Sequence, residues 1–186
     1  MGEAPPAGSM TAAEYLAWEA GQMEKHEYVR GEVFSVGGAS RRRVTVSGNL
    51  FLELAQVLAD GPCRVYMADM KLALEADTAY FYPDVLVTCD PDDHRADQVM
   101  RRPLLVVEVL SPSTAANDRG EKASAYRSLP SLREFVLVDP ERQTVELYQR
   151  QEENVWQLRD VRPGQSLLLS SLELEIPWQR IFRNVD

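Results

Sequence analysis

The spacing of apolar and polar positions predicts helices at both ends of a group of strands. A capping-box pattern at Thr11–Glu14 stands ahead of an apolar stripe and predicts a short helix over about residues 12–20. Arg30–Gly31 separates two β-prone pieces, which predicts a hairpin. Over about residues 41–60, apolar residues recur at helical spacing until Gly61–Pro62, which predicts a longer helix.

The rest of the chain consists of strand-like runs interrupted by one helix-like run. The predicted strands on either side of a polar loop are Arg64–Leu74, Tyr80–Thr88 and Leu104–Leu110. A helix is predicted at Asn117–Leu129, and a short terminal helix at Pro177–Arg183. Two further strand pairs are predicted, Phe135–Asp139 with Val145–Gln149 and Trp156–Val161 with Leu167–Leu169. This order predicts an α/β fold with helices before and after a central sheet.

Composition is that of an ordinary globular protein and limits the partners. The chain has 186 residues, 45% apolar and 26% charged, which suits one domain with a sizeable core. We expect residues 1–9 to form a disordered tail and residues 10–186 to form a single domain. The net charge of −9 argues against a protein that binds nucleic acid through overall charge, but it permits a local basic patch. No apolar run approaches the roughly 20 residues of a membrane span, so we expect a cytoplasmic protein without a membrane partner.

Cysteine and histidine are scarce, which limits the chemistry of thiols and soft metals. Cys63 and Cys89 are well separated and form no CxxC motif, so we expect two reduced, packed thiols. His26 and His94 are the only histidines, which argues against a zinc site, and we expect His94 to lie on the solvated surface.

Two carboxylates interrupt apolar strands, and they are the strongest chemical signal in the sequence. Glu108 lies within the apolar run Leu104–Leu110, and Asp84 is followed by three apolar residues. Such runs are buried on both faces of a sheet, where a carboxylate costs several kcal/mol unless something compensates for it. A cation side chain, a raised pKa or a metal ion can each do so. Two such carboxylates favour Mg²⁺ or Mn²⁺, although a buried ion pair remains the simpler alternative.

Lys122 is the third candidate, and its place on the predicted helix directs it inward. It lies four residues before Tyr126 and seven before Leu129, so the three side chains share the apolar face. The helix follows directly after the strand of Glu108. An inward ammonium group could pair with Glu108 alone, or it could act on a water molecule or a developing anion in the same site.

A longer set of residues matches a known family in order and spacing. The set comprises Thr11–Leu16, Glu27–Glu32, Tyr82–Asp84, Val107–Ser113, Asp118, Lys122, Tyr126 and Phe135–Pro140. These residues resemble the Uma2 (DUF820) family, which is placed in the PD-(D/E)XK nuclease superfamily. The resemblance covers nearly the whole chain from about Met10. It implies a restriction-endonuclease-like fold, with a mixed central sheet flanked by helices, and a metal-dependent phosphodiesterase site.

The resemblance also implies roles by position. Asp84 and Glu108 match the acidic pair of the PD-(D/E)XK motif, with the Val109 carbonyl as a further metal ligand. The plain motif has lysine two residues after the glutamate, where this chain has Leu110. Lys122, on the following helix, is the matching lysine.

The first hairpin and the second helix complete the resemblance. Glu27 matches the upstream acidic residue of the family and could hold the water shell of the ion or fix Lys122; Glu32 is the alternative. Arg30 stands where the family usually has aspartate, and Arg43 where it often has histidine. Both departures could alter substrate contacts.

The basic run Arg41, Arg42 and Arg43 is unfavourable for the helix dipole at a helix start, so it is either a solvated face or a contact for DNA. We include these arginines and Tyr126 as candidate substrate-binding residues. The leading hypothesis is an endonuclease that hydrolyses DNA with Mg²⁺ or Mn²⁺, and the resemblance implies a homodimer. The alternatives are a catalytically silent module with an ion-pair cluster in place of the active site, and a metal hydrolase for small phosphoesters.

Overall fold

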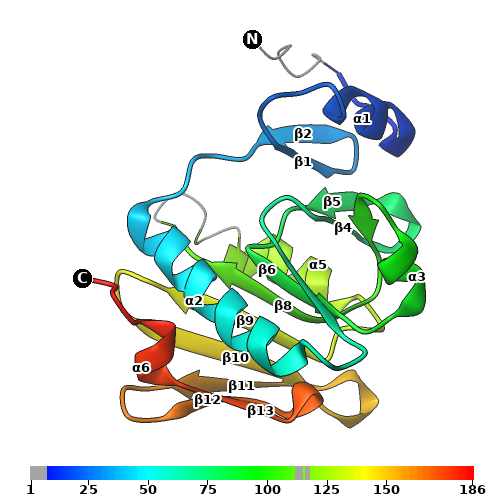
Figure 1. Cartoon of the computed structure of the whole chain (residues 1–186). Coiled ribbons are helices and arrows are strands. Elements are labelled where there is room, and N and C mark those ends of the chain that lie inside the picture. The colour runs from blue at the N-terminus through cyan, green and yellow to red at the C-terminus, as the bar shows by residue number, and fades with distance from the viewer. Residues whose placement is uncertain (1–7, 112–114, 116–117) are drawn as a thin grey trace.

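The computed structural model describes residues 8–111, 115 and 118–186, and a six-stranded sheet forms its centre (Figure 1). From edge to edge the strands are β11 (Trp156–Val161), β10 (Thr144–Arg150), β9 (Glu134–Asp139), β8 (Pro103–Val109), β6 (Val85–Thr88) and β3 (Arg64–Met67). β8 and β9 run parallel, and the other neighbouring strands run antiparallel. The mixed central sheet is therefore confirmed.

Both faces of this sheet are covered (Figure 1). One face packs against α2 (Arg41–Leu58), α6 (Trp178–Ile181) and the hairpin of β12 (Ser166–Leu169) and β13 (Leu174–Pro177). The other face packs against α5 (Ala123–Arg127), which follows the π-helical turn η2 (Asp118–Lys122). Along β8, Val107 and Val109 enter the first core, while Val106 and Leu110 enter the second. Glu108 points to the same side as Val106 and Leu110 and therefore faces α5, where the Tyr126 hydroxyl contacts it.

A second, five-stranded sheet carries the N-terminal part of the chain. Its strands, in spatial order, are β2 (Glu32–Ser35), β1 (His26–Val29), β5 (Ala79–Phe81), β4 (Lys71–Ala73) and β7 (Val99–Met100). α1 (Ala12–Glu19) packs on it through Tyr15, whose ring stacks on Tyr28 at 5.1 Å. Thr11 and Glu14 form the predicted capping box at the start of α1. The remaining short elements are η1 (Glu75–Asp77), α3 (Pro91–Arg95), η3 (Glu152–Asn154) and η4 (Ser170–Leu172).

Two predicted strands each divide into two. The run Tyr80–Thr88 forms β5 and β6, which belong to different sheets. Pro83 lies at the break, where it has no N–H to donate to a ladder. The run Arg64–Leu74 likewise forms β3 and β4, one in each sheet. The polar loop between residues 90 and 102 contains α3 and β7, and His94 is exposed, as predicted.

The pairing predicted for Trp156–Val161 with Leu167–Leu169 is wrong. β11 pairs with β10, and β12 pairs with β13, which the sequence did not indicate. Gly164 has a φ of +85°, so the expected turn is present. That turn carries the chain from the central sheet to a separate hairpin, because turn chemistry marks a change of direction but does not select the partner strand.

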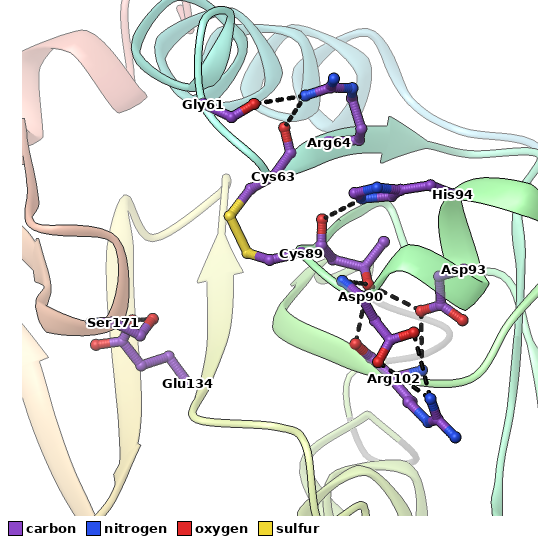
Figure 2. Close-up of a disulfide and its surroundings, with 11 residues drawn as sticks. Gly61, Cys63, Arg64, Cys89, Asp90, Asp93, His94, Arg102, Glu134 and Ser171 are labelled. Carbon is purple, nitrogen blue, oxygen red and sulfur yellow. Dashed lines mark hydrogen bonds and ion pairs between the residues drawn. A yellow bond between two sulfur atoms is a disulfide. The ribbon is translucent and has the colours of Figure 1, made fainter.

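The expectation of two reduced thiols is also wrong, because Cys63 and Cys89 form a disulfide (Figure 2). Arg64 pairs with Thr88 in the antiparallel ladder of β3 and β6. The two cysteines are the next residues outward on each strand, so they face each other across the ladder. A separation of 26 residues hides this relation in the sequence.

The helix predicted at Asn117–Leu129 is shorter and less regular than expected, since the π-helical turn η2 leads into α5. Its expected first residue, Asn117, lies outside the described residues, as do residues 1–7 of the expected tail and residues 112–114 of the matched motif. The predicted terminal helix is α6, with Pro177 at its N-cap. Within the described ranges, no helix has the length and apolar character needed to cross a bilayer.

Candidate active site

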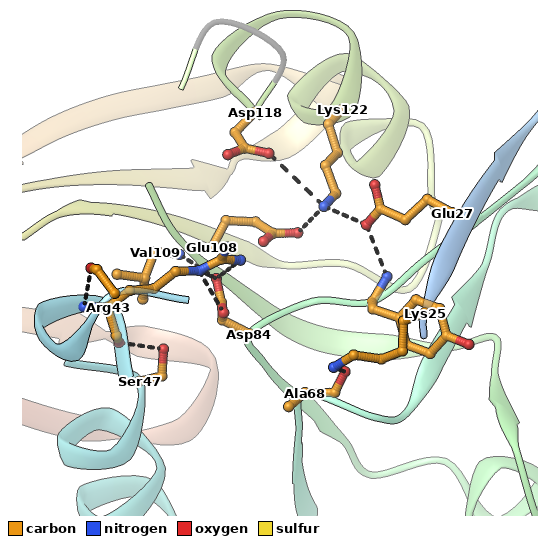
Figure 3. A network of polar contacts seen from close by, with 12 residues as sticks. Lys25, Glu27, Arg43, Ser47, Ala68, Asp84, Glu108, Val109, Asp118 and Lys122 are labelled. Carbon is orange, nitrogen blue, oxygen red and sulfur yellow. Dashed lines mark hydrogen bonds and ion pairs between the residues drawn. The ribbon is translucent and has the colours of Figure 1, made fainter. Parts of the chain in front are cut away.

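Asp84 and Glu108 meet because β6 and β8 are antiparallel neighbours. Val85 pairs with Val107, so the next residues in register are Asp84 and Glu108. Residues opposite each other in such a ladder point to the same side of the sheet. In Figure 3, the Glu108 carboxylate lies between Lys122 on one side and the pair formed by Arg43 and Asp84 on the other.

Glu108 is buried, with 1% of its surface exposed, and only one of its oxygens is paired. Tyr126 donates its hydroxyl to Oε1 at 2.6 Å, and the Lys122 ammonium group lies 3.0 Å from the same oxygen. Oε2 is buried and has no hydrogen-bond partner among the described residues. Burial raises the pKa of Glu108, the Lys122 charge opposes this, and the Asp84 carboxylate adds to the rise.

Lys122 lies inside the protein, as its predicted helix face requires, and it contacts three carboxylates. Its ammonium nitrogen is 2.8 Å from Glu27 Oε1, 3.0 Å from Glu108 Oε1 and 3.9 Å from Asp118 Oδ1. Burial by itself lowers the pKa of Lys122, but the three acidic neighbours outweigh this and raise it. The side chain is therefore a fixed positive charge between β8 and the first hairpin.

Glu27 joins the N-terminal sheet to the site. It lies on β1, and its Oε1 accepts hydrogen bonds from Lys122 and from the backbone N–H of Tyr82 at 3.1 Å. The Tyr82 N–H is available because the chain leaves the ladder at this point, one residue after β5 and before Pro83. The upstream acid implied by the family resemblance is thus in contact with the lysine.

Asp84 is held by Arg43 and by the backbone. The Arg43 guanidinium donates from Nε to Oδ1 at 3.1 Å and from Nη2 to Oδ2 at 2.9 Å. The N–H of Val109 also donates to Oδ2, at 2.8 Å. Burial lowers the pKa of Arg43, but the carboxylates of Asp84, Glu108 and Asp118 together outweigh this and raise it.

The other candidate substrate contacts lie elsewhere. Arg41 donates to the Asp186 carbonyl, and Arg42 pairs with Glu141 on the surface. Tyr126 is fully buried, so its position favours holding Glu108 over touching a substrate. Of the basic run, Arg43 alone contacts a proposed site residue within the described part of the chain.

A cleft of about 700 Å³ opens beside Asp84. Arg43, Ser47 and Gly38 from the start of α2 and the loop before it line one part, and Tyr82 and Asp84 line another. A substrate group can therefore reach Asp84 from solvent.

The oxygen donors fit a hard divalent ion. The unpaired Oε2 of Glu108 is a buried acceptor that such an ion would satisfy, and Asp84 directly precedes Val85, which pairs with Val107 beside Glu108. Among the described residues, no cluster of three or more histidine, cysteine or acidic side chains is arranged to hold an ion. Mg²⁺ is typically held by one or two carboxylates and keeps several waters, so two carboxylates are a sufficient donor set.

The sequence did not indicate what surrounds Tyr82. The ammonium groups of Lys25 and Lys71 lie 5.6 and 5.3 Å from the centre of its ring, and its hydroxyl donates to the buried Glu19 at 2.8 Å. The chain has only three lysines, and the third is Lys122. That scarcity was a signal, because all three lie around the segment that leads into Asp84.

The mixed sheet flanked by helices is the fold of restriction-endonuclease-like nucleases. The chain is similar to the crystal structure of "a putative nuclease belonging to DUF820" from Anabaena variabilis ATCC 29413, with a TM-score of 0.77. Sequence identity is 17%, and the match covers 95% of this chain and 99% of that chain.

The chain belongs to the Uma2 family, whose model is described as "Putative restriction endonuclease" and matches residues 12–181. Two relatives come from Synechocystis sp. (strain ATCC 27184 / PCC 6803 / Kazusa). "Uncharacterized protein slr1290" is 36% identical over 180 residues, covering 97% of this chain and 95% of the relative. "Uncharacterized protein sll1609" is 32% identical over 174 residues, covering 92% and 95%.

Proposed function

We propose that this protein is an endonuclease that hydrolyses DNA phosphodiester bonds with the help of Mg²⁺ or Mn²⁺. The observation that carries the proposal is Oε2 of Glu108, a buried carboxylate oxygen without a hydrogen-bond partner among the described residues, in a side chain close enough to Asp84 for the two charges to interact. The description of the family supports the nuclease activity and DNA as the substrate.

In this proposal, Asp84, Glu108 and the Val109 carbonyl would hold the ion. The chemistry that such an ion would supply is a lower pKa for a nearby water molecule, which would make that water a better nucleophile near neutral pH. Tyr126 fixes Oε1 of Glu108 through its hydroxyl, which leaves Oε2 for the ion. The Val109 N–H fixes the Asp84 carboxylate in the same way.

Lys122 offsets negative charge at the attacked phosphate. Its ammonium group is a compact charge held between Glu108 and Glu27, so it needs no reorganisation when charge develops on the substrate. Glu27 acts through Lys122 as a positioning residue, and Tyr82 positions Glu27 through its backbone N–H. The cleft beside Asp84 is where the DNA backbone would approach.

Cleavage of supercoiled plasmid DNA tests the proposal. We expect nicking with Mg²⁺ or Mn²⁺ and none with EDTA, and a loss of about a hundredfold or more in Asp84→Asn and Glu108→Gln. Asp77→Asn is the matched control, since Asp77 pairs with Arg101 on the surface, and it should cleave like the wild type. Failure of the wild type to cleave DNA, with hydrolysis of a small phosphodiester instead, would favour the hydrolase alternative.

The silent-module alternative draws on one observation. Asp84 is paired with Arg43, and Glu108 with Lys122, so the described site residues already compensate one another's charge. If this were the whole role of the cluster, millimolar Mn²⁺ would not raise the melting temperature. A bound ion would raise it, because the ion stabilises only the folded state.

We also propose a homodimer. β11 is an edge strand of the central sheet, and Leu158 on it is about half exposed, which leaves a strand edge available for pairing with a second copy. Sedimentation at micromolar concentration should give twice the chain mass of 21.0 kDa. A mass equal to one chain would contradict the proposal.

A further inference from the structure

Arg43 and Lys122 differ in how many oxygens of the neighbouring carboxylate each one contacts. Lys122 contacts one oxygen of Glu108 and leaves the other unpaired, whereas Arg43 contacts both oxygens of Asp84. We propose that Arg43 is a competing counter-cation, which must release Asp84 before a divalent ion binds there and therefore sets the metal affinity of the site. This inference rests on the proposed function, because it takes Asp84 as a ligand of the ion.

The contacts at Asp84 leave little room for a second cation. Two guanidinium nitrogens lie within 3.1 Å of its oxygens, and the Val109 N–H takes a further position on Oδ2. An ion bound at about 2.0–2.6 Å from the same carboxylate would lie beside a like charge. The Arg43 and Asp84 side chains are only 12% and 13% exposed, so solvent screens this repulsion weakly.

The backbone of Arg43 is fixed, so the exchange requires only its side chain to move. The Arg43 N–H donates to the Ser40 side chain at the N-cap of α2, and its carbonyl accepts from the Ser47 hydroxyl. The guanidinium group has a place to go, because Arg43 lines the cleft of about 700 Å³ beside Asp84. A planar guanidinium can exchange a carboxylate for another bidentate anion in that cleft.

This arrangement explains how a site built for a cation can remain folded without one. Arg43 neutralises Asp84 while the ion is absent, which avoids an uncompensated carboxylate in a largely buried position. The same contact weakens ion binding, because the ion must displace the guanidinium group. Removal of Arg43 should therefore weaken the ion-free protein and strengthen ion binding, which are opposite effects of one substitution.

Mn²⁺ binding, measured by calorimetry and by the loss of the free-ion electron paramagnetic resonance signal, tests the inference without an activity assay. Arg43→Gln keeps a hydrogen-bond donor for Asp84 but removes the charge, and we expect it to bind Mn²⁺ about tenfold or more tightly than the wild type. Arg43→Lys keeps the charge but loses the bidentate contact, so its affinity should lie between the two. Mn²⁺ should also raise the melting temperature of Arg43→Gln more than that of the wild type.

Arg42→Gln is the matched control, because the neighbouring side chain pairs with Glu141 and does not touch Asp84. It should bind Mn²⁺ like the wild type, and Asp84→Asn should weaken binding both alone and with Arg43→Gln. If the wild type binds Mn²⁺ through Asp84 but Arg43→Gln binds no more tightly, the inference is overturned and the metal site stands. If neither the wild type nor Arg43→Gln binds Mn²⁺ at millimolar concentration, the inference falls together with the metal dependence of the proposed function.

Discussion

Replacement of Lys122 by methionine is expected to reduce both stability and activity. Methionine keeps most of the length of the side chain and removes the ammonium group. In the native protein that group lies against Glu27, Glu108 and Asp118, and the lysine side chain is 6% exposed. The variant therefore leaves three neighbouring carboxylates without the cation they share, in a place where little water can replace it.

The magnitude follows from the burial of these groups. Removal of one partner of a buried ion pair costs about 3–5 kcal/mol. Glu27 retains some exposure and Asp118 is the most distant of the three, so we expect a loss near the lower end, about 3 kcal/mol. Loss of a cation at the attacked phosphate should also remove about 2–4 kcal/mol of transition-state stabilisation, which is on the order of a hundredfold or more in rate.

Urea unfolding at pH 7.5 and pH 5.5, together with plasmid cleavage at a temperature where the variant is folded, measures both effects. Part of the stability should return at pH 5.5, because carboxylates that have lost the neighbouring ammonium group can then bind protons. Arg119→Met is the matched control on the same π-helical turn, since Arg119 pairs with Glu146 near the surface. It should lose less than about 1 kcal/mol and cleave normally.

Two results would refute the reasoning. A Lys122→Met protein as stable as the Arg119→Met control would show that the buried carboxylates do not depend on the ammonium group. Wild-type cleavage by a destabilised Lys122→Met protein would make Lys122 a structural ion-pair partner and remove it from the proposed catalytic machinery.

Three further predictions concern the pH dependence, the disulfide and the first hairpin. Burial raises the pKa of Glu108 from 4.5 to about 8. The wild type should therefore lose stability relative to Glu108→Gln as pH rises from about 4.5 to 8, by up to about 1.4 kcal/mol per pH unit. Parallel pH profiles of the two unfolding free energies would contradict this. Replacing Cys63 and Cys89 by serine should cost about 3 kcal/mol in urea unfolding, because the disulfide closes a loop across 26 positions. Mass spectrometry without reductant should detect the bond. Equal stability of the two proteins would argue that the bond does not form. Gly31→Ala should cost about 1 kcal/mol or more in thermal unfolding, since Gly31 has a φ of +99° and an added Cβ would lie 2.0 Å from Ser9 Oγ. An unchanged melting temperature would mean that stability does not depend on glycine in this turn.

The sequence alone determined the features that depend on a few neighbouring residues. The capping box of α1 and the hairpin of β1 and β2 follow from residue types at short spacing. The burial of Glu108 follows from the apolar run around it, and the inward direction of Lys122 follows from helical periodicity with Tyr126. The apolar pattern also singled out Asp84, and the resemblance to a family added Glu27, whose carboxylate contacts Lys122 in the structure.

Only the tertiary structure decided which distant residues became partners. Cys63 faces Cys89 because β3 pairs with β6, and the sequence patterns of the two strands did not specify that register. Arg43 reaches Asp84 across 41 positions because α2 packs against the sheet near the end of β6. Local patterns state whether a segment is a helix or a strand and which of its sides is apolar. The choice of neighbour depends on the packing of the whole chain, which is why the contact that we expect to control metal binding was not visible before the fold was known.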